Sequence, residues 1–456
     1  MKPVRVFFSR LSITSHLISS TIYILPVAIT TGSIVALFLW LLDKVLQFRI
    51  GRTWLLFLLP LAGIVIYLVY RYFGRNAEAG NNLVIDEIHQ PGEGVPLRMA
   101  PLVLSTTLIT HLFGGSAGRE GTAVQIGGSL AYFFSGIFRL THENTRMLLM
   151  AGMAAGFGSV FGTPVAGAVF ALEVIAVGRI RHEMMLPCFI ASLVADVTCR
   201  AWGISHTQYP TLPQNTASVY FSMIHFDFFL LCKVIAAGVL FGLAALLFAK
   251  VTRIIKAFNG RWIRVKWLVP VLGGLLVILL TYLLGTRDYL ALGVSNPEPG
   301  SVSILSSFEQ GGAGPFSWLW KLVFTAITLG TGFKGGEVTP LFFIGASLGN
   351  TIAAISGAPV DLLAALGFIA VFAGATNTPL ACVFMGVELF GANHLVYYAV
   401  ACFTAYYFSG SSGIYEAQRS TVSKVRFRKQ EQANSPGEQR KESTSKISGR
   451  GDDEPL

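Results

Sequence analysis

A glycine-dense stretch that holds one carboxylate is where the sequence most clearly offers chemistry. Residues 114–122 are Gly-Gly-Ser-Ala-Gly-Arg-Glu-Gly-Thr, with mostly apolar residues 102–113 before them and the uncharged residues 123–134 after them. Because a charge at membrane depth is costly, the side chain of Glu120 must face protein or water rather than lipid. The glycines let backbone N–H groups approach a ligand, and a helix starting there would direct its positive dipole end at an anion. We therefore expect Glu120 to replace a bound anion, to carry protons, or to do both.

Other ionisable residues in apolar surroundings indicate structure rather than chemistry. Glu173 and Glu388 could form a proton relay, but their matching positions in two halves of the chain favour a role in bonding helix ends. His111 has no second histidine at metal-ligand spacing, so we expect a hydrogen-bonded interior histidine. A polar connection holds three further candidates, which we expect on a solvated surface: Asp86, Glu87 and His89. No metal or other cofactor is predicted.

The composition is that of a membrane protein. Of the 456 residues, 53% are hydrophobic and only 13% are charged, against about 25% charged residues in soluble domains. Segments 23–42 and 54–70 are apolar and long enough to span a bilayer. The basic residues cluster at the ends and in short connections, which indicates cytoplasmic faces rather than nucleic-acid binding. The chain lacks a serine or cysteine nucleophile motif and His-Glu-x-x-His, so we do not expect an enzyme.

The order of apolar and polar segments predicts an all-α polytopic membrane protein with both termini in the cytoplasm. Several apolar segments, such as 102–114, are too short to cross upright and predict broken or re-entrant helices. We expect, in order, a cytoplasmic N-terminal segment, a first transmembrane repeat, a connection, a second transmembrane repeat and a disordered cytoplasmic tail, at residues 1–20, 21–202, 203–227, 228–416 and 417–456.

The second apolar block repeats the first. Residues 162–166 (Gly-Thr-Pro-Val-Ala) match residues 377–381 (Asn-Thr-Pro-Leu-Ala) at an offset of 215, and residues 118–130 match residues 336–348 at an offset of 218. Paired glycine-rich breaks at matching positions point to the substrate site of an inverted-repeat transporter. A parallel repeat would give the same pattern and stays open.

These motifs resemble those of the CLC anion channels and anion/proton antiporters. The glutamate-gate motif of that family matches Gly118, Arg119, Glu120 and Gly121. Residues 336–340 lie where the family has Gly-x-Phe-x-Pro, and Tyr415 lies where a late helix supplies a hydroxyl to the central anion, although it could also be an interfacial aromatic residue. The resemblance covers residues 20–418 and implies a CLC-type fold of inverted repeats around a mid-membrane anion site, in a homodimer.

Departures from the family pattern are similar to those of the CLC-F branch, the bacterial fluoride/proton antiporters. An amide, Asn81, stands where the usual turn has its central serine. The later motif contains a Glu-Val-Thr stretch characteristic of that branch: Glu337, Val338 and Thr339. The internal proton-transfer glutamate of chloride/proton antiporters corresponds to Val174, so the resemblance implicates Glu337 in coupling. A plain pairing of Glu337 with Lys334 is the alternative.

The resemblance implies export of fluoride in exchange for protons across the bacterial inner membrane, with Glu120 as gate and Glu337 as second proton-carrying group. Fluoride is a small, strong hydrogen-bond acceptor, and an asparagine offers two N–H donors where a serine offers one hydroxyl. The anion-binding residues that we expect are Asn81, Asn82, Gly118, Arg119, Gly121, Val338, Thr339 and Tyr415. One of the two asparagines could instead serve as a left-handed turn residue. A passive fluoride or chloride channel and a chloride/proton antiporter are the alternatives.

Overall fold

The computed structural model describes residues 2–210, 227–296, 298, 300–410 and 413–420, with no description of side chains for residues 2–20. Most of the predicted connection at 203–227 and of the predicted disordered tail at 417–456 therefore lies outside the described residues. The predicted N-terminal segment forms one helix with the first span, over Lys2–Arg49, and this helix continues through Pro26 and Gly32.

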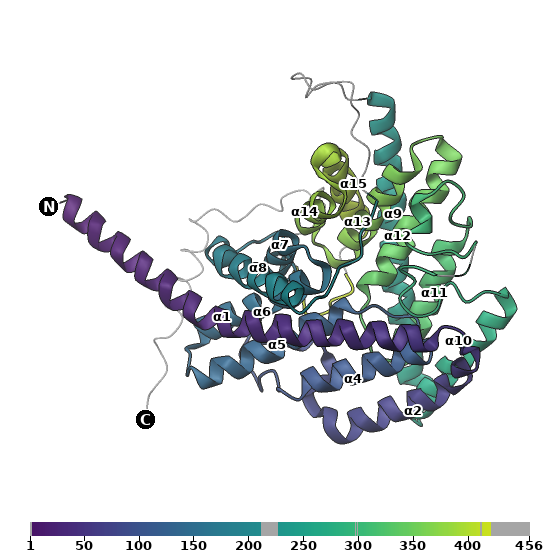
Figure 1. Cartoon of the computed structure of the whole chain (residues 1–456), viewed down its shortest axis with the longest axis horizontal. Coiled ribbons are helices and arrows are strands. Elements are labelled where there is room, and N and C mark those ends of the chain that lie inside the picture. Colours follow the sequence, from purple (N-terminus) through teal and green to yellow (C-terminus); the bar gives the residue numbers. More distant parts are fainter. Residues whose placement is uncertain (1, 211–226, 297, 299, 411–412, 421–456) are drawn as a thin grey trace, which may run out of the picture. The chain divides into compact units, whose positions relative to one another are not determined.

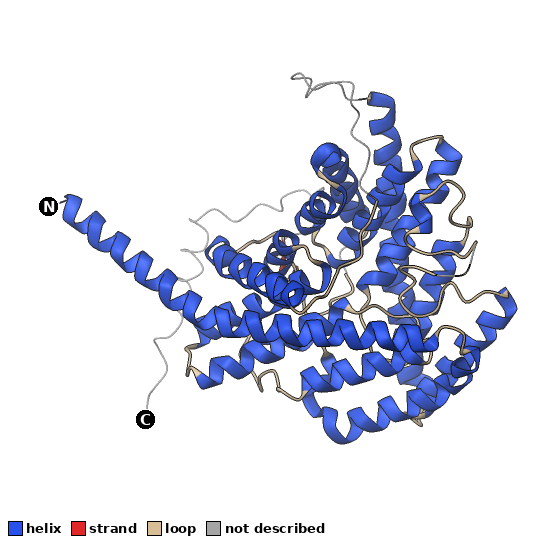
Figure 2. Cartoon of the chain, viewed as in Figure 1, coloured by secondary structure: helices blue, strands red, loops and turns tan. Residues whose placement is uncertain are grey.

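The regular secondary structure of the described chain is almost entirely helical, as predicted (Figures 1 and 2). The helices of its first half are α1 (Lys2–Arg49), α2 (Leu59–Val69), α3 (Asn81–His89), α4 (Met99–Leu112), α5 (Glu120–Ile137), α6 (His142–Phe161), α7 (Pro164–Glu173) and α8 (Met185–Ala201). Those of its second half are α9 (Phe228–Trp262), α10 (Leu268–Leu284), α11 (Ser317–Gly330), α12 (Val338–Ser356), α13 (Val360–Thr376), α14 (Pro379–Phe390) and α15 (Leu395–Phe408).

Short elements connect these helices. Short 3₁₀ helices are η1 (Thr53–Leu58), η3 (Arg75–Ala79), η4 (His182–Met184), η5 (Ser306–Phe308) and η6 (Ala392–His394), and η2 (Tyr70–Gly74) is a short π-helix. Two two-residue strands, β1 (Ala176–Val177) and β2 (Arg419–Ser420), pair in parallel, so the start of the tail lies beside the segment that follows α7.

The helix lengths fit a membrane protein with broken helices. Five described helical segments are long and apolar enough to cross a membrane: Thr21–Arg49, Thr53–Ala79, His182–Ala201, Phe228–Trp262 and Val338–Ser356. Shorter apolar helices, among them α4, α7 and α14, cover only part of a bilayer. Large apolar side chains are exposed along α1, α2, α8, α9 and α10, as expected of faces that contact lipid.

The two halves are related by a local two-fold arrangement centred on a pair of matching glycines. Gly118 and Gly336 form an antiparallel bridge in which each backbone N–H donates to the other's carbonyl, at 2.6 and 2.7 Å. The packing of α5 on α6 is repeated by that of α12 on α13. In each pair, glycines at the matching positions 127 and 345 meet glycines 152 and 367, where an added Cβ would collide with the facing carbonyl.

Two carboxylates, the buried Glu173 and the half-buried Glu388, show the relative direction of the halves. Glu173, the last residue of α7, accepts hydrogen bonds from the N–H groups of Leu380 and Ala381 in the first turn of α14, at 3.2 and 2.9 Å. Glu388 of α14 accepts in the same way from Val165 and Ala166 in the first turn of α7. Since each helix ends where the other begins, α7 and α14 are antiparallel and the repeat is inverted. The predicted helix-bonding role of these glutamates is confirmed.

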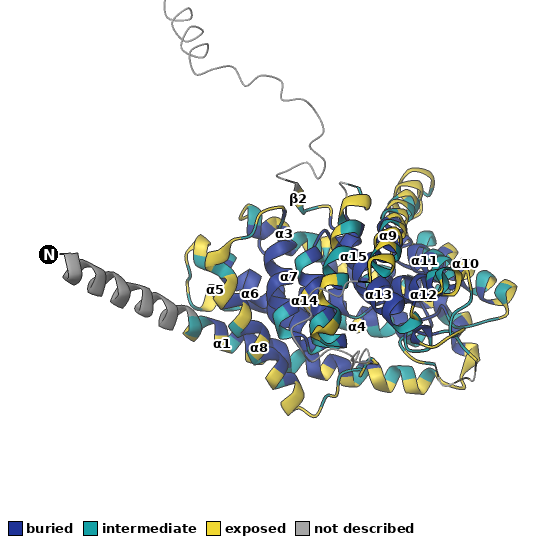
Figure 3. Ribbon diagram, turned by 90° about the horizontal axis from the view of Figure 1, so that it is seen from above, coloured by how far each residue is buried: buried dark blue, intermediate teal, exposed yellow. Residues whose placement is uncertain are grey.

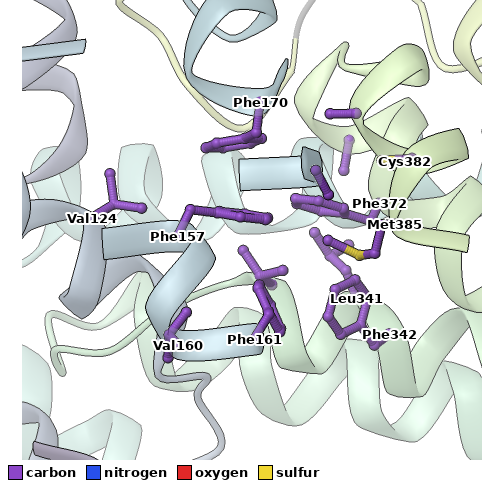
Figure 4. Packing of buried hydrophobic residues seen from close by; sticks show 14 of the residues in the cluster. Val124, Phe157, Val160, Phe161, Phe170, Leu341, Phe342, Phe372, Cys382 and Met385 are labelled. Carbon is purple, nitrogen blue, oxygen red and sulfur yellow. The ribbon is translucent and has the colours of Figure 1, made fainter. Parts of the chain in front are cut away.

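Aromatic side chains fill the space between the halves. The helices at the centre of the molecule, including α6, α7 and α13, are buried along most of their length (Figure 3). Phe157 stacks on Phe170 with ring centroids 4.2 Å apart, and Phe342 stacks on Phe368 at 3.8 Å. Phe372 contacts rings from both halves (Figure 4). This core fixes the helix starts that form the site described next.

Candidate functional site

Three helices begin at one point inside the molecule. α5 begins at Glu120 and α12 at Val338, directly after the paired glycines Gly118 and Gly336. α3 begins at Asn81, whose Nδ2 would lie 3.1 Å from a Cβ added to Gly121. Each helix N-terminus carries unpaired N–H groups and a partial positive charge. Their convergence makes a site suited to an anion, as the glycine-rich breaks in the sequence predicted.

The carboxylate of Glu120 occupies this point. Its Oε2 accepts hydrogen bonds from the backbone N–H of Thr339, at 3.1 Å, and from that of Arg119, at 3.0 Å. Its Oε1 accepts a hydrogen bond from the hydroxyl of Thr339. Glu120 is 1% exposed, so these donors and the helix dipoles stabilise its charge in place of water. The side chain therefore sits where a small anion bound at the start of α12 would sit.

The segment before α5 is held in place by buried polar contacts. His111 lies with its ring nitrogens 2.8 Å from the carbonyl of Thr107 and 3.1 Å from that of Ala117, which confirms the predicted interior histidine. The backbone N–H of Ser116 donates to the Thr328 hydroxyl of α11. The guanidinium of Arg119 lies 3.6 Å from the Glu120 carboxylate and is 18% exposed. Arg119 is thus an ion-pair partner of Glu120 on its more open side.

The two asparagines have different environments. Asn81 points toward Gly121, and its Oδ1 is buried without a hydrogen-bond partner in the described structure. Asn82 accepts a hydrogen bond from the backbone N–H of Ala417, so it anchors the start of the tail. The suggestion that one of them adopts a left-handed turn is wrong, because Gly80 has the positive φ of 58° and both asparagines begin α3. The residue types around Asn81 do not show which residue is the last before the helix and which is the first inside it.

Glu337 lies one residue before α12, beside a small cavity of about 20 Å³. The cavity is also lined by Arg253 and Lys256 of α9 and by Glu416. Lys334 instead places its ammonium 4.1 Å from the centre of the Tyr70 ring, and no ion pair between Lys334 and Glu337 occurs in the described residues. The geometry therefore places Glu337 next to the start of α12 and beside this cavity, and it does not pair Glu337 with Lys334.

Two tyrosines lie near the Glu120 carboxylate. Tyr415 is buried and packs the edge of its ring against Phe170. It is close enough to Glu120 and Glu337 to interact with the charges of their carboxylates. Its burial contradicts the alternative of an interfacial aromatic residue. Tyr209 is also within range of Glu120 and contacts three phenylalanines. Sequence reasoning missed Tyr209 because it lies in a polar connection without any motif.

The three polar residues Asp86, Glu87 and His89, in the second half of α3, are only partly exposed to solvent. Asp86 is exposed, as expected. Glu87 is buried and accepts hydrogen bonds from the N–H groups of Gly92 and Gly94, and the Nε2 of His89 lies 2.9 Å from the carbonyl of Ile175. The expectation of a solvated surface is therefore wrong for these two residues. Unbonded N–H groups in the turn after α3 account for the burial of the Glu87 carboxylate.

Comparison with known proteins agrees with this fold. The family described as voltage gated chloride channel matches residues 62–410. The chain belongs to this family. A chloride/fluoride channel protein of Pseudomonas syringae pv. tomato is 48% identical over 402 residues, which are 87% of this chain and 86% of that protein. Family members are channels or transporters, in agreement with the expectation that the chain is not an enzyme.

Solved structures of the CLC family have the same fold. The crystal structure of a CLC-type fluoride/proton antiporter aligns with a TM-score of 0.82 and 34% identity, over 89% of this chain and 98% of that one. A slow cyanobacterial Cl⁻/H⁺ antiporter aligns with a TM-score of 0.71 at 18% identity, over 87% and 96% of the two chains. The predicted CLC-type, inverted-repeat architecture is confirmed.

Proposed function

We propose that this CLC protein exports fluoride in exchange for protons, with the Glu120 carboxylate as gate and proton carrier. The observation that carries the proposal is the position of that carboxylate at the start of α12, where it takes the hydrogen bonds that a bound anion would take. Fluoride displaces the carboxylate, which then accepts a proton and leaves the anion path. Simultaneous records of fluoride efflux and pH from proteoliposomes test this function.

Fluoride is the favoured ion because the site offers convergent donors rather than a roomy cage. Thr339 supplies a hydroxyl and an N–H, the Asn81 amide supplies up to two N–H donors, and Tyr415 supplies a hydroxyl. The names of two similar proteins, a chloride/fluoride channel protein and a fluoride/proton antiporter, point the same way. The first of these names supports the second candidate, a passive channel with the same anion path.

The Thr339 hydroxyl is expected to set the rate of fluoride transport. Thr339→Val removes one of the donors that face Glu120 and keeps the side-chain volume and the backbone N–H. We expect fluoride efflux from liposomes to fall by about tenfold or more, because preorganised donors that bind an anion are rarely replaced by water in a buried site. Thr339→Ser, which retains the hydroxyl, should stay near wild type. Equal rates for Val and Ser variants would contradict the role of the hydroxyl.

The Asn81 amide is expected to favour fluoride over chloride. Asn81→Ser removes amide donors next to the start of α5, and the preference for fluoride should fall by about tenfold, the effect of about one hydrogen bond. The assay is the ratio of fluoride to chloride efflux. Asn82→Ser is the matched control, since Asn82 bonds the tail instead. An unchanged ratio in Asn81→Ser would remove Asn81 from the anion path.

Glu337 is proposed as the second proton-carrying group. Glu337→Gln should lower the number of protons moved per fluoride by about tenfold, since an amide carries no proton. Glu416→Gln is the matched control, because Glu416 lines the same cavity but is exposed. Fluoride flux and pH change are recorded together. If both variants keep the wild-type ratio, Glu337 is structural.

The setting that we propose is the bacterial inner membrane, with both termini in the cytoplasm and the chain in a homodimer. Basic residues of separate connections gather around the start of the tail. Arg253 of α9 donates a hydrogen bond to the carbonyl of Gly413, and Arg419 pairs with the segment that contains Arg179 and Arg181. A shared cytoplasmic face for these residues agrees with the positive-inside rule.

A further inference from the structure

A second cavity, away from Glu120, is lined by arginines. Its volume is about 530 Å³, and its walls come from the end of α3, from α6, from the segment that follows α7 and from the start of the tail. We call it the basic cavity and define it by Arg146, Arg179, Arg181, Arg419 and His89. None of these residues belongs to the proposed anion path.

The positive charge of the basic cavity is only partly balanced. Arg146 donates to the carbonyl of Ile88 and to Glu143, and Glu143 also lies 3.9 Å from Arg181. Glu183 is the acidic residue of the lining itself, whereas Glu143 lies beside it. Arg179 and Arg419 are exposed, and neither guanidinium forms an ion pair in the described part of the chain. Four guanidinium groups around one cavity therefore face two carboxylates.

The geometry points to a binding site for a phosphate group in the basic cavity. Guanidinium groups bind phosphate oxygens through paired N–H donors and with charge assistance, which makes several arginines around one space a phosphate-binding arrangement. The phosphate can come from the head group of an anionic lipid or from a soluble phosphate compound. Basic pockets at cytoplasmic faces of membrane proteins hold such head groups.

Occupancy of the basic cavity bears on the segment that carries Tyr415. Arg419 lies four residues after Tyr415, and its backbone N–H donates to the carbonyl of Ile175 at 3.3 Å. A phosphate held by both Arg419 and Arg179 would join the tail segment 413–420 to the segment after α7 across the cavity. Backbone N–H groups in residues 413–420 should then exchange more slowly with deuterated water when phosphate is bound.

The test compares a double variant of this cavity with a matched double variant elsewhere. Arg179→Gln/Arg419→Gln removes two arginines of the lining, and Arg261→Gln/Arg264→Gln removes two exposed arginines, one in the last turn of α9 and one just after it. One arm measures the binding of inorganic phosphate to purified protein from its thermal stabilisation, at constant chloride concentration. The other arm measures by native mass spectrometry how much phosphatidylglycerol stays bound.

We expect affinity in at least one arm to fall by about tenfold or more in Arg179→Gln/Arg419→Gln and to stay at the wild-type value in the control. A loss in the lipid arm alone assigns a head group, and a loss in the phosphate arm assigns a soluble ligand. Arg181→Gln, a single change in the same lining, should give a smaller loss. Equal binding by both double variants, or no binding of either probe by the wild type, would overturn the proposal. Because both arms measure binding, neither depends on which ion the protein transports.

Discussion

Glu120→Gln is expected to abolish proton transport while the protein stays folded. The amide has the size of the carboxylate and can still lie at the start of α12, but it cannot take up and release a proton. Loss of a side chain that transfers protons typically lowers the rate by about a hundredfold or more. We therefore expect the fluoride-driven pH change in proteoliposomes to fall below about one-hundredth of the wild-type value.

The control for this variant is Glu143→Gln, which changes an exposed carboxylate that forms ion pairs with Arg146 and Arg181 near the basic cavity. It should retain the wild-type ratio of protons to fluoride. Proton transport that persists in Glu120→Gln would show that another group carries the proton, and Glu120 would then be a residue that only satisfies the N–H groups at the start of α12.

Glu173→Ala is expected to have the largest effect on stability. The change leaves the N–H groups of Leu380 and Ala381 without their acceptor inside the protein. An unsatisfied buried N–H group costs about 1–3 kcal/mol, so we expect a loss of about 2–4 kcal/mol and a clearly lower midpoint of thermal unfolding in detergent. Glu183→Ala, at an exposed position, should unfold like wild type.

Glu173 also distinguishes a structural carboxylate from a proton relay. Glu173→Gln keeps one oxygen acceptor and should lower the stability less than Glu173→Ala does. Because we assign Glu173 to helix bonding, the ratio of protons to fluoride should be unchanged in the folded fraction of Glu173→Gln. A loss of proton transport at normal stability would reverse that assignment and place Glu173 in the proton path.

Much of the architecture could be predicted because it rests on patterns that repeat along the chain. The matched glycine-rich segments at 118–130 and 336–348 predicted a two-fold relation, and the matched glutamates predicted bonded helix ends. The inversion itself could not be predicted from these patterns. The inversion depends on which helix start each carboxylate bonds. Glu173 and Glu388 each bond a helix start that is more than 200 residues away in the sequence.

The residues that were missed or misjudged have in common that their surroundings come from distant segments. Tyr209 lies in a polar connection and approaches the site only because α13 and α14 carry the phenylalanines against which it packs. Glu87 looks solvated by its polar neighbours, yet the turn after α3 folds back and bonds it. The arginines of the basic cavity are separated by up to 273 positions, from Arg146 to Arg419, so no local motif marks them.

The central claim is tested most directly by efflux of fluoride and of chloride from liposomes that hold the purified protein, with internal pH recorded at the same time. The account predicts efflux selective for fluoride, accompanied by proton uptake that continues against a proton gradient. Fluoride efflux without any pH change would contradict coupled exchange and indicate a passive channel. Equal or faster chloride efflux would contradict the assignment of Asn81 and Thr339 to fluoride selectivity.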